Sequence, residues 1–216
     1  MKKPRSSKQK PGEILSRYTS LPVLLDLIER KSLIFLKPDT WQDRNDSQVM
    51  KEYKETRKLT CLLALCFSKG DETIYHWNAF ASGPAGCRID IHLPSLIDQV
   101  KNQDNIRYGK VSYRKMHRIT DTDLEDKKMP FIKRWPYRIE EEFRLIYEST
   151  NPVDAERSEL VVPIEMNSIR SITVSQSMPE TVFASIKLQL GAKLGKRISR
   201  STLFENRTWI NKFKLK

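Results

Sequence analysis

An unbroken apolar run at residues 60–68 constrains the fold of this chain more than any other feature. It is bounded by charged residues and by Gly70. Its apolar and polar positions do not alternate, as they would in a strand with one exposed face. The run therefore predicts a central strand that is buried on both faces.

The rest of the chain changes irregularly between strand-like and helix-like patterns. Leu21, Leu24, Leu25 and Ile28 keep the i, i+3, i+4, i+7 spacing of a helix, which Ser20 can cap. Because the order is not strictly βαβ, we predict an α+β fold with a central mixed, mostly antiparallel sheet flanked by helices. We expect further strands near residues 33–36, 87–91, 107–113, 142–148, 160–164 and 169–174, and further helices near 47–58, 74–80, 94–100, 122–128 and 179–190.

Positive charge is concentrated at the two ends of the 216-residue chain, whose net charge is +12. Residues 1–10 carry five basic residues and no acid, and residues 187–216 carry nine basic residues and one acid. Such ends indicate contact with a nucleic-acid phosphate backbone, or tails that only keep the protein soluble. We expect a flexible basic arm at 1–12, a single α+β domain at 13–190 and a basic C-terminal extension packed on it at 191–216. The candidate nucleic-acid-binding residues are Lys2, Lys3, Arg5, Lys196, Arg197 and Arg200.

The cysteines, histidines and hydropathy argue against several classes of protein. Cys61, Cys66 and Cys87 form no Cys-x-x-Cys pair and lie in apolar or strand-like surroundings, so we expect buried, reduced thiols. The three histidines lack the spacing of a zinc site, and we predict no metal centre. No apolar run reaches the roughly 20 residues of a membrane span, and the N-terminus lacks the apolar core of a signal peptide. We therefore expect a cytoplasmic protein with no membrane association.

Three consecutive carboxylates, Glu140 to Glu142, run directly into residues 143–147, where apolar and polar positions nearly alternate. This alternation predicts a strand with one buried face, and Glu142 would stand at its mouth. A carboxylate fixed there by rigid backbone suits acid/base or charge-stabilising chemistry. Glu141 would point to the other side of an extended segment, so Glu142 and then Glu140 are the candidates. The alternative is a solvated acidic cluster that faces neighbouring arginines.

Two upstream features suit ligand binding. Arg17 precedes the predicted helix N-terminus, where backbone N–H groups and the helix dipole favour anions, unless it pairs on the surface with Asp26 or Glu13. Tyr75 and Trp77 belong to a short aromatic-rich helix. Such side chains either fill the core or stack on a flat ligand ring.

Short motifs occur in a fixed order along residues 14–190: Arg17 to Leu21, residues 38–43, Cys66 to Ser68, Trp77, Gly86 to Ile89 and Trp135 to Arg144. Their order resembles that of a widespread bacterial domain-of-unknown-function family, numbered twenty-nine seventy-one. That family usually shows Phe-Asn-Asp-Pro-Phe-Glu where this chain has residues 41–46, of which Asp43 and Asp46 keep an acid. Its final motif, aromatic-Glu-x-Glu-aromatic-Arg, is matched at residues 139–144 except at Ile139.

An early Arg-Tyr-Thr, a middle strand that ends in Ser and a late Glu at a strand start also resemble the ADP-ribosyltransferase layout. This resemblance implies an ADP-ribosyltransferase-like fold with NAD as substrate. Glu142 would hold the ribose 2′-hydroxyl and stabilise the oxocarbenium-like state as nicotinamide leaves, and Glu140 would deprotonate the acceptor or pair with a neighbouring arginine. Arg17 would bind the NAD pyrophosphate. The other cofactor-binding candidates are Thr19 or Ser68 for the nicotinamide ribose or carboxamide, Tyr75 or Trp77 for stacking on the nicotinamide, and Tyr18.

Three functions remain open at this point, besides a purely structural partner protein. The first is an NAD-dependent ADP-ribosyltransferase of a toxin or phage-defence type, which acts on nucleic acid or protein. The second is a metal-dependent nuclease in which Asp90, Glu140 and Glu142 hold magnesium, although such sites usually have Lys where Arg144 stands. The third is a non-catalytic nucleic-acid-binding module, supported by the charge and by tryptophans that can stack on bases. These tryptophans are Trp41, Trp77, Trp135 and Trp209.

Overall fold

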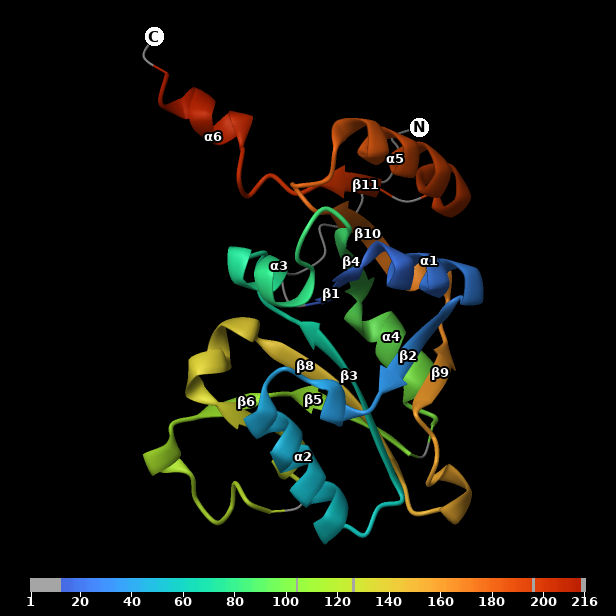
Figure 1. The fold of residues 1–216 in the computed structure, drawn as a ribbon, viewed down its shortest axis with the longest axis vertical. Helices are drawn as coiled ribbons and strands as arrows, with labels where there is room; N and C mark the ends of the chain where they lie inside the picture. Colours follow the sequence, from blue (N-terminus) through green and yellow to red (C-terminus); the bar gives the residue numbers. More distant parts are fainter. Residues whose placement is uncertain (1–12, 104, 126, 196, 215–216) are drawn as a thin grey trace, which may run out of the picture.

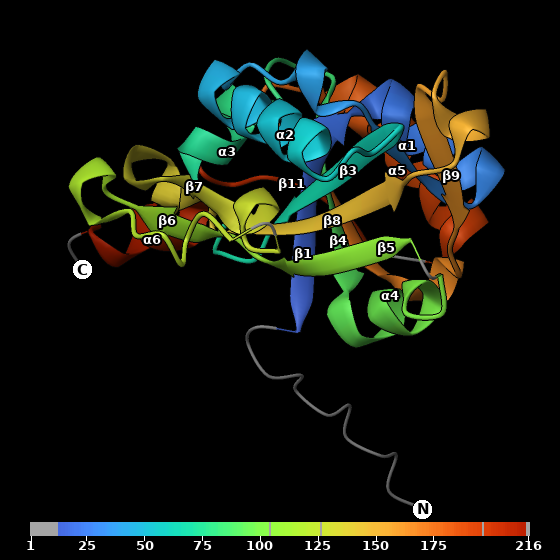
Figure 2. The ribbon, with the colours of Figure 1, turned by 90° about the horizontal axis from the view of Figure 1, so that it is seen from below.

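A computed structural model describes residues 13–103, 105–125, 127–195 and 197–214. Within these ranges, helices flank a mixed, mostly antiparallel sheet of nine strands, which confirms the predicted α+β fold (Figures 1 and 2). Four of the candidate nucleic-acid-binding residues lie outside the described ranges: Lys2, Lys3, Arg5 and Lys196.

The main sheet has the strand order β11-β10-β4-β1-β3-β2-β9, and β8 pairs with both β3 and β5. The strands are β1 (Ile14–Ser20), β2 (Ser32–Leu36), β3 (Cys61–Ser68), β4 (Gly86–His92), β5 (Ile106–Lys110), β6 (Ser112–Arg114), β7 (Ile132–Arg134), β8 (Glu142–Ser149), β9 (Glu159–Pro163), β10 (Ile169–Val174) and β11 (Arg197–Arg200). The α-helices are α1 (Leu21–Arg30), α2 (Arg44–Thr56), α3 (Ile74–Phe80), α4 (Leu93–Val100), α5 (Glu180–Leu194) and α6 (Arg207–Lys212). Three short 3-10 helices border the sites described below: η1 (Pro38–Thr40), η4 (Trp135–Glu140) and η5 (Pro152–Asp154).

Strand β3 is the branch point of the sheet. One of its edges pairs with the whole of β8, which places Ser68 opposite Glu142. Two strands share the other edge: β2 pairs with it at Ala64, and β1 pairs with it at Ser68. Among the described strands, none pairs with residues 65–67 on that edge. β1 and β2 therefore diverge there, and α1 connects them.

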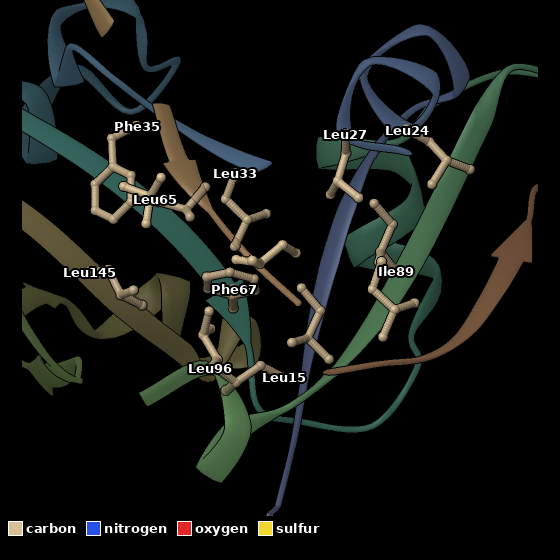
Figure 3. Close-up of a cluster of buried hydrophobic side chains, with 14 of the residues drawn as sticks. Leu15, Leu24, Leu27, Leu33, Phe35, Leu65, Phe67, Ile89, Leu96 and Leu145 are labelled. Carbon is tan, nitrogen blue, oxygen red and sulfur yellow. The ribbon is translucent and has the colours of Figure 1, made fainter. Parts of the chain in front are cut away.

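Alternation along β3 divides its side chains between two hydrophobic clusters. Leu63, Leu65 and Phe67 face the larger cluster, together with residues of α1, α4, β1, β2 and β4 (Figure 3). Leu62 and Ala64 face a smaller cluster beneath α2, the helix that lies over β3 and β8 in Figure 2. The strand is thus buried on both faces, as the apolar run predicts.

Helix α1 begins at Leu21 with Ser20 as its N-cap residue, as predicted, but two details differ from the prediction. Arg17 lies inside β1 and pairs with Ile89 of β4, because β1 continues in register with β4 as far as Ser20. Ser20 is the N-cap residue of α1, but its side chain makes no capping hydrogen bond. The first helical N–H, that of Leu21, donates instead to the backbone oxygen of Ala85 at 2.7 Å.

Two other segments differ from the expected pattern. No helix forms at residues 122–128 within the described ranges, because the Asp123 carboxylate accepts from the Thr120 N–H and hydroxyl and holds a turn. Helix α5 continues to Leu194, and β11 pairs in parallel with β10. The sheet therefore includes part of the segment 191–216, for which we expected a packed extension.

Gly86 begins β4 where the backbone of Ala81 comes close. A Cβ atom at Gly86 would lie 1.9 Å from the Ala81 carbonyl oxygen. We expect Gly86→Ala to lower the free energy of unfolding by about 1–3 kcal/mol, because the backbone must shift. In the matched control Gly191→Ala, nothing lies within 4 Å of the new Cβ, and helix α5 gains up to about 1 kcal/mol. Urea unfolding followed by circular dichroism measures both values, and equal effects would contradict the close approach.

Candidate functional site

A cavity of about 420 Å³ lies between β1, β2 and β3, where β1 and β2 diverge from each other along one edge of β3. Helix α3, helix η4 and the segment between β2 and α2 complete its lining. Its volume lies in the usual range for small-molecule sites, about 300–1,000 Å³. Six of the eight predicted catalytic and cofactor-binding residues line it: Arg17, Tyr18, Ser68, Tyr75, Glu140 and Glu142.

Arg17 brings an unpaired positive charge to this cavity. Its side chain is half-buried, and in the described part of the chain it has neither an ion pair nor a hydrogen bond. Burial lowers the pKa of Arg17 below its usual value. A guanidinium nevertheless stays protonated at neutral pH, because its intrinsic pKa is so high. Arg17 is therefore available to an anionic ligand.

Glu142 begins β8, and Arg144 holds its buried carboxylate. Arg144 Nε and Nη2 donate to Glu142 Oε1 and Oε2 at 2.7 and 3.0 Å. The same guanidinium is fully buried and donates to Asp46 Oδ1 and Oδ2 at 3.2 and 2.7 Å. The ring of Trp41 lies 4.7 Å from it. Arg144 thus fixes one carboxylate of β8 and one of α2 in a single geometry.

A second buried cation, Lys133 of β7, joins this cluster. Its Nζ lies 2.6 Å from Glu140 Oε2, and 3.4 Å from oxygens of both Asp46 and Glu142. The Tyr75 hydroxyl donates to Glu140 Oε1 at 2.9 Å. Three carboxylates and two cations therefore meet beside the cavity, where low dielectric strengthens each interaction.

Burial and ion pairing act on these pKa values in opposite directions. Burial alone raises the pKa of Glu142, but Arg144 and Lys133 outweigh it and bring that pKa to about 2. For Glu140 and Asp46 burial dominates, and their pKa values lie above those of ordinary carboxyl groups. Glu142 is ionised at neutral pH and suits charge stabilisation, whereas the higher proton affinity of Glu140 suits proton transfer.

The low pKa of Glu142 makes a pH-dependent contribution to stability. Because its pKa is lowered from 4.5 to about 2, this contribution is complete above pH 4.5 and is lost as the pH falls towards 2. The raised pKa values of Glu140 and Asp46 act in the opposite direction, so a variant is needed to isolate Glu142. We expect Glu142→Gln to lower the free energy of unfolding by about 3 kcal/mol at pH 7 and by much less at pH 3.

Urea unfolding at pH 7, 5, 4 and 3 measures this difference. Glu165→Gln, which changes an exposed carboxylate, is the matched control and should differ little from the parent at any pH. A deficit of Glu142→Gln that stays constant down to pH 3 would contradict the stabilising role of the ionised carboxylate.

Aromatic rings from β1 and α3 form one wall of the cavity. Tyr18 stacks on His76 with ring centroids 4.9 Å apart, and Tyr75 meets His76 edge-on. His76 is buried between the Thr73 hydroxyl, 2.7 Å from Nδ1, and the Glu140 backbone oxygen, 3.2 Å from Nε2. Burial lowers the pKa of His76, so the ring is neutral at pH 7. It supports the wall and holds the turn at Glu140.

Two predicted cofactor-binding residues do not line the cavity. Thr19 is buried in β1 opposite Cys87. Trp77 is also buried, donates its indole N–H to Glu72 at 2.8 Å and packs edge-on against Tyr18. Both side chains belong to the packed interior. Helix α3 turns Trp77 inward and Tyr75 towards the cavity.

The three carboxylates of the nuclease hypothesis do not meet in one site. The Asp90 carboxylate accepts two hydrogen bonds from Arg88, at 2.9 and 2.8 Å, and one each from the hydroxyls of Ser16 and Ser171, at 2.8 and 2.7 Å. Asp90 does not line the cavity. Within the described ranges no group of three or more His, Cys, Asp or Glu residues is placed to hold a metal ion.

The sequence patterns did not predict that Lys133 and Asp46 belong to the cluster of charged residues beside the cavity. Lys133 lies in a three-residue strand, β7, which is too short for a periodic pattern to indicate which way its side chain points. For Asp46 the sequence did contain an indication, since this position keeps an acid where family twenty-nine seventy-one shows Glu. Glu141 is outside the cavity lining for an unforeseen reason: its φ of 42° ends η4 in the left-handed region, and the segment is not extended.

The candidate nucleic-acid-binding residues that the structure describes belong to β11. Arg197 is exposed, and Arg200 Nη1 lies 2.9 Å from Glu180 Oε2. Neither lines the cavity between β1 and β3. Every helix in the described ranges is too short or too polar to cross a membrane.

Comparison with known proteins finds only distant structural similarity. No family model and no curated protein matches the chain, so the resemblance to family twenty-nine seventy-one stays a prediction. The structure of Thermus sp. 2.9 DarT in complex with NAD+ is 8% identical, with a TM-score of 0.44 over 89% of this chain and 96% of that chain. The structure of Thermus sp. 2.9 DarT in complex with ADP-ribosylated ssDNA is 10% identical, with a TM-score of 0.43 over 89% and 95%.

Proposed function

We propose that this chain is an NAD-dependent ADP-ribosyltransferase whose reaction takes place in the cavity between β1 and β3. One observation supports the proposal most. The unpaired guanidinium of Arg17 and the ionised carboxylate of Glu142 face one cavity, from strands on opposite edges of β3. A ligand that combines an anionic group with a centre that becomes cationic during reaction matches both charges.

NAD combines these two groups in one molecule. The reaction breaks the bond between the nicotinamide nitrogen and the ribose C1′, and the bonding electron pair leaves with neutral nicotinamide. The nucleophile of the acceptor then bonds to C1′. Glu142 accepts a hydrogen bond from the ribose 2′-hydroxyl and stabilises the positive charge that develops on the ribose. Glu140 takes the proton of the acceptor, which its raised pKa favours.

The other lining residues supply binding. Arg17 receives the pyrophosphate through its fork of N–H donors. The Ser68 hydroxyl, which accepts the Gly70 N–H at 3.2 Å, is free to donate to the nicotinamide ribose or carboxamide. Tyr75 offers its ring to the nicotinamide, beside the Tyr18 and His76 stack. Thr19 and Trp77 lie in the interior, so Ser68 and Tyr75 are the members of the predicted pairs that we assign to these roles.

The acceptor class that we propose is nucleic acid or protein, in a cytoplasmic toxin or phage-defence setting. The positive charge of the chain ends favours nucleic acid, because a phosphate backbone is drawn to clustered Lys and Arg.

Removing the Arg17 charge tests the binding half of the proposal. NAD should raise the melting temperature of the parent protein, because a ligand of the native state stabilises it. We expect Arg17→Gln to weaken NAD binding about 10- to 100-fold, the loss typical of a charged hydrogen-bonding partner. The unfolding free energy without NAD should change by less than about 0.5 kcal/mol, as for a side chain with no partner to lose.

The matched control is Arg170→Gln, which removes an exposed arginine from β10 and should leave NAD binding unchanged. Arg17→Lys keeps the charge without the fork and should give an intermediate affinity. If Arg17→Gln binds NAD with the affinity of the parent, Arg17 does not bind the pyrophosphate. The whole proposal fails if NAD shifts no melting temperature and labelled NAD releases no nicotinamide with DNA, RNA or protein acceptors.

A further inference from the structure

A second cavity of about 260 Å³ shares the segment between β2 and α2 with the first. Consecutive residues of the segment between β2 and α2 divide between the two: Lys37 to Asp39 line the second, and Thr40 to Asp43 line the first. Helix α2 and strand β3 also contribute to both. Four basic side chains line the second cavity against one acid, Asp39. The basic residues are Lys37, Lys51, Lys54 and Arg157.

Two of these four cations have no partner. Lys37 and Lys54 are half-buried, and among the residues that the structure describes the side chain of neither makes an ion pair or a hydrogen bond. Lys51 has only a long, exposed contact of 3.9 Å with Glu55. Arg157 is held 2.6 Å from Asp154, which aims its guanidinium without removing the positive excess of the cavity.

Rigid elements position these charges. Lys37 immediately precedes Pro38, whose fixed φ starts η1. Lys51 and Lys54 are three positions apart in α2 and so share one helix face. Arg157 follows η5 and is anchored by the Asp154 carboxylate, Nε to Oδ1 at 2.7 Å. The cations therefore converge from three separate segments.

The floor of the cavity adds no negative charge. Cys61 lies there, buried, with its Sγ 3.8 Å from the Arg157 backbone oxygen. Burial raises the pKa of this thiol, so it is neutral at pH 7. A concave site with an excess of one sign of charge concentrates the opposite ion, because its walls focus the field, and here four basic side chains outnumber the one acid, Asp39.

We propose that this second cavity is a phosphate-binding site, in which Lys37, Lys54 and Arg157 hold a phosphate group beside the candidate NAD site. Unpaired lysines that served only for solubility would sit apart on a convex surface, whereas these converge on a hollow. A phosphate has the charge and the number of acceptor oxygens to engage all three. The proposal does not depend on the chemistry of the first cavity.

Inorganic phosphate is the probe for this site, with potassium chloride at equal ionic strength as the reference. The experiment uses an Arg17→Gln background, so that phosphate bound in the first cavity does not contribute. Phosphate should raise the melting temperature in this background. Adding Lys37→Gln and Lys54→Gln should weaken phosphate binding by about tenfold or more. The control pair Lys101→Gln and Lys193→Gln removes the same amount of charge from exposed ion pairs elsewhere and should leave phosphate binding unchanged.

A second readout reports from inside the cavity. Bound phosphate should slow alkylation of Cys61 by a small thiol reagent, measured on its peptide by mass spectrometry, and Cys87 is the internal reference. Protection of Cys61 should disappear in the Lys37→Gln, Lys54→Gln variant. The proposal is overturned if phosphate and chloride act alike, or if the lysine variant and the control pair respond equally to phosphate.

The phosphate group belongs either to a nucleic-acid backbone or to a small phosphorylated molecule. A labelled single-stranded oligonucleotide separates the two sources. The source is the nucleic-acid backbone if oligonucleotide binding falls in the Lys37→Gln, Lys54→Gln variant but not in the control pair. Inorganic phosphate should then also displace the oligonucleotide. Oligonucleotide binding equal in both variants, together with a phosphate effect that needs Lys37 and Lys54, identifies a small molecule.

Discussion

Arg144→Met lowers the free energy of unfolding by about 3–5 kcal/mol, because two buried carboxylates lose the cation that is hydrogen-bonded to them and keep only the longer contacts with Lys133, at 3.4 Å. Glu142 and Asp46 each receive two hydrogen bonds from this guanidinium, and both are less than a tenth exposed. Arg144 also donates to the backbone oxygen of Pro130 at 2.8 Å, so the substitution frees a third acceptor. Urea unfolding at pH 7 measures the loss.

The control for this prediction is Arg30→Met, which removes an exposed ion pair with Asp26 and should cost less than about 1 kcal/mol. A triple variant separates lost charge balance from lost packing. Adding Asp46→Asn and Glu142→Gln to Arg144→Met removes the uncompensated carboxylates, so we expect it to recover a large part of the stability. A triple variant less stable than Arg144→Met alone would show that shape, and not charge, controls the cluster.

Glu142→Gln lowers the rate of ADP-ribosyl transfer by about 100- to 1,000-fold, the usual effect of removing one group that stabilises developing charge. The amide keeps the size of the side chain and can still accept a hydrogen bond, but it cannot balance a cationic ribose. NAD affinity should therefore change much less than the rate. Release of labelled nicotinamide and labelling of the acceptor measure the rate, below the melting temperature of the variant.

Glu141→Gln is the matched control, since it makes the same change one position away in a side chain that does not line the cavity. It should transfer ADP-ribose at the parent rate. Glu140→Gln should slow transfer to the acceptor, because the proton then has no base. If Glu142→Gln turns over NAD at the parent rate, Glu142 is not a catalytic residue, even if NAD binds in the cavity.

The central strands could be predicted from the sequence because local patterns determine them. The apolar run of β3 needs no partner to be recognised, and the alternation after Glu142 places a strand start at that residue, as the structure has it. The single buried face that the alternation predicts is wrong, because Arg144 and Ile146 are as fully buried as Leu145. The aromatic-rich helix α3 and the strands β9 and β10 were also predicted from composition and periodicity.

The charge cluster could not be predicted in the same way. Asp46 and Arg144 pair across 98 positions of sequence, and a local pattern carries no information on such a contact. Arg17 was recognised as suited to anions for the wrong reason, since it stands in a strand and not at a helix N-terminus. What suits it to an anion is the absence of a carboxylate partner among the described residues, a property of the folded arrangement.

The branch at β3 also affects how the two sides of the first cavity can move. β1 meets β3 at the single pair Ser16 and Ser68, whereas β8 is joined to β3 along its whole length. β1 and β4 form one part of the sheet, and β3 and β8 form another. A small rotation of one part against the other would strain few backbone hydrogen bonds.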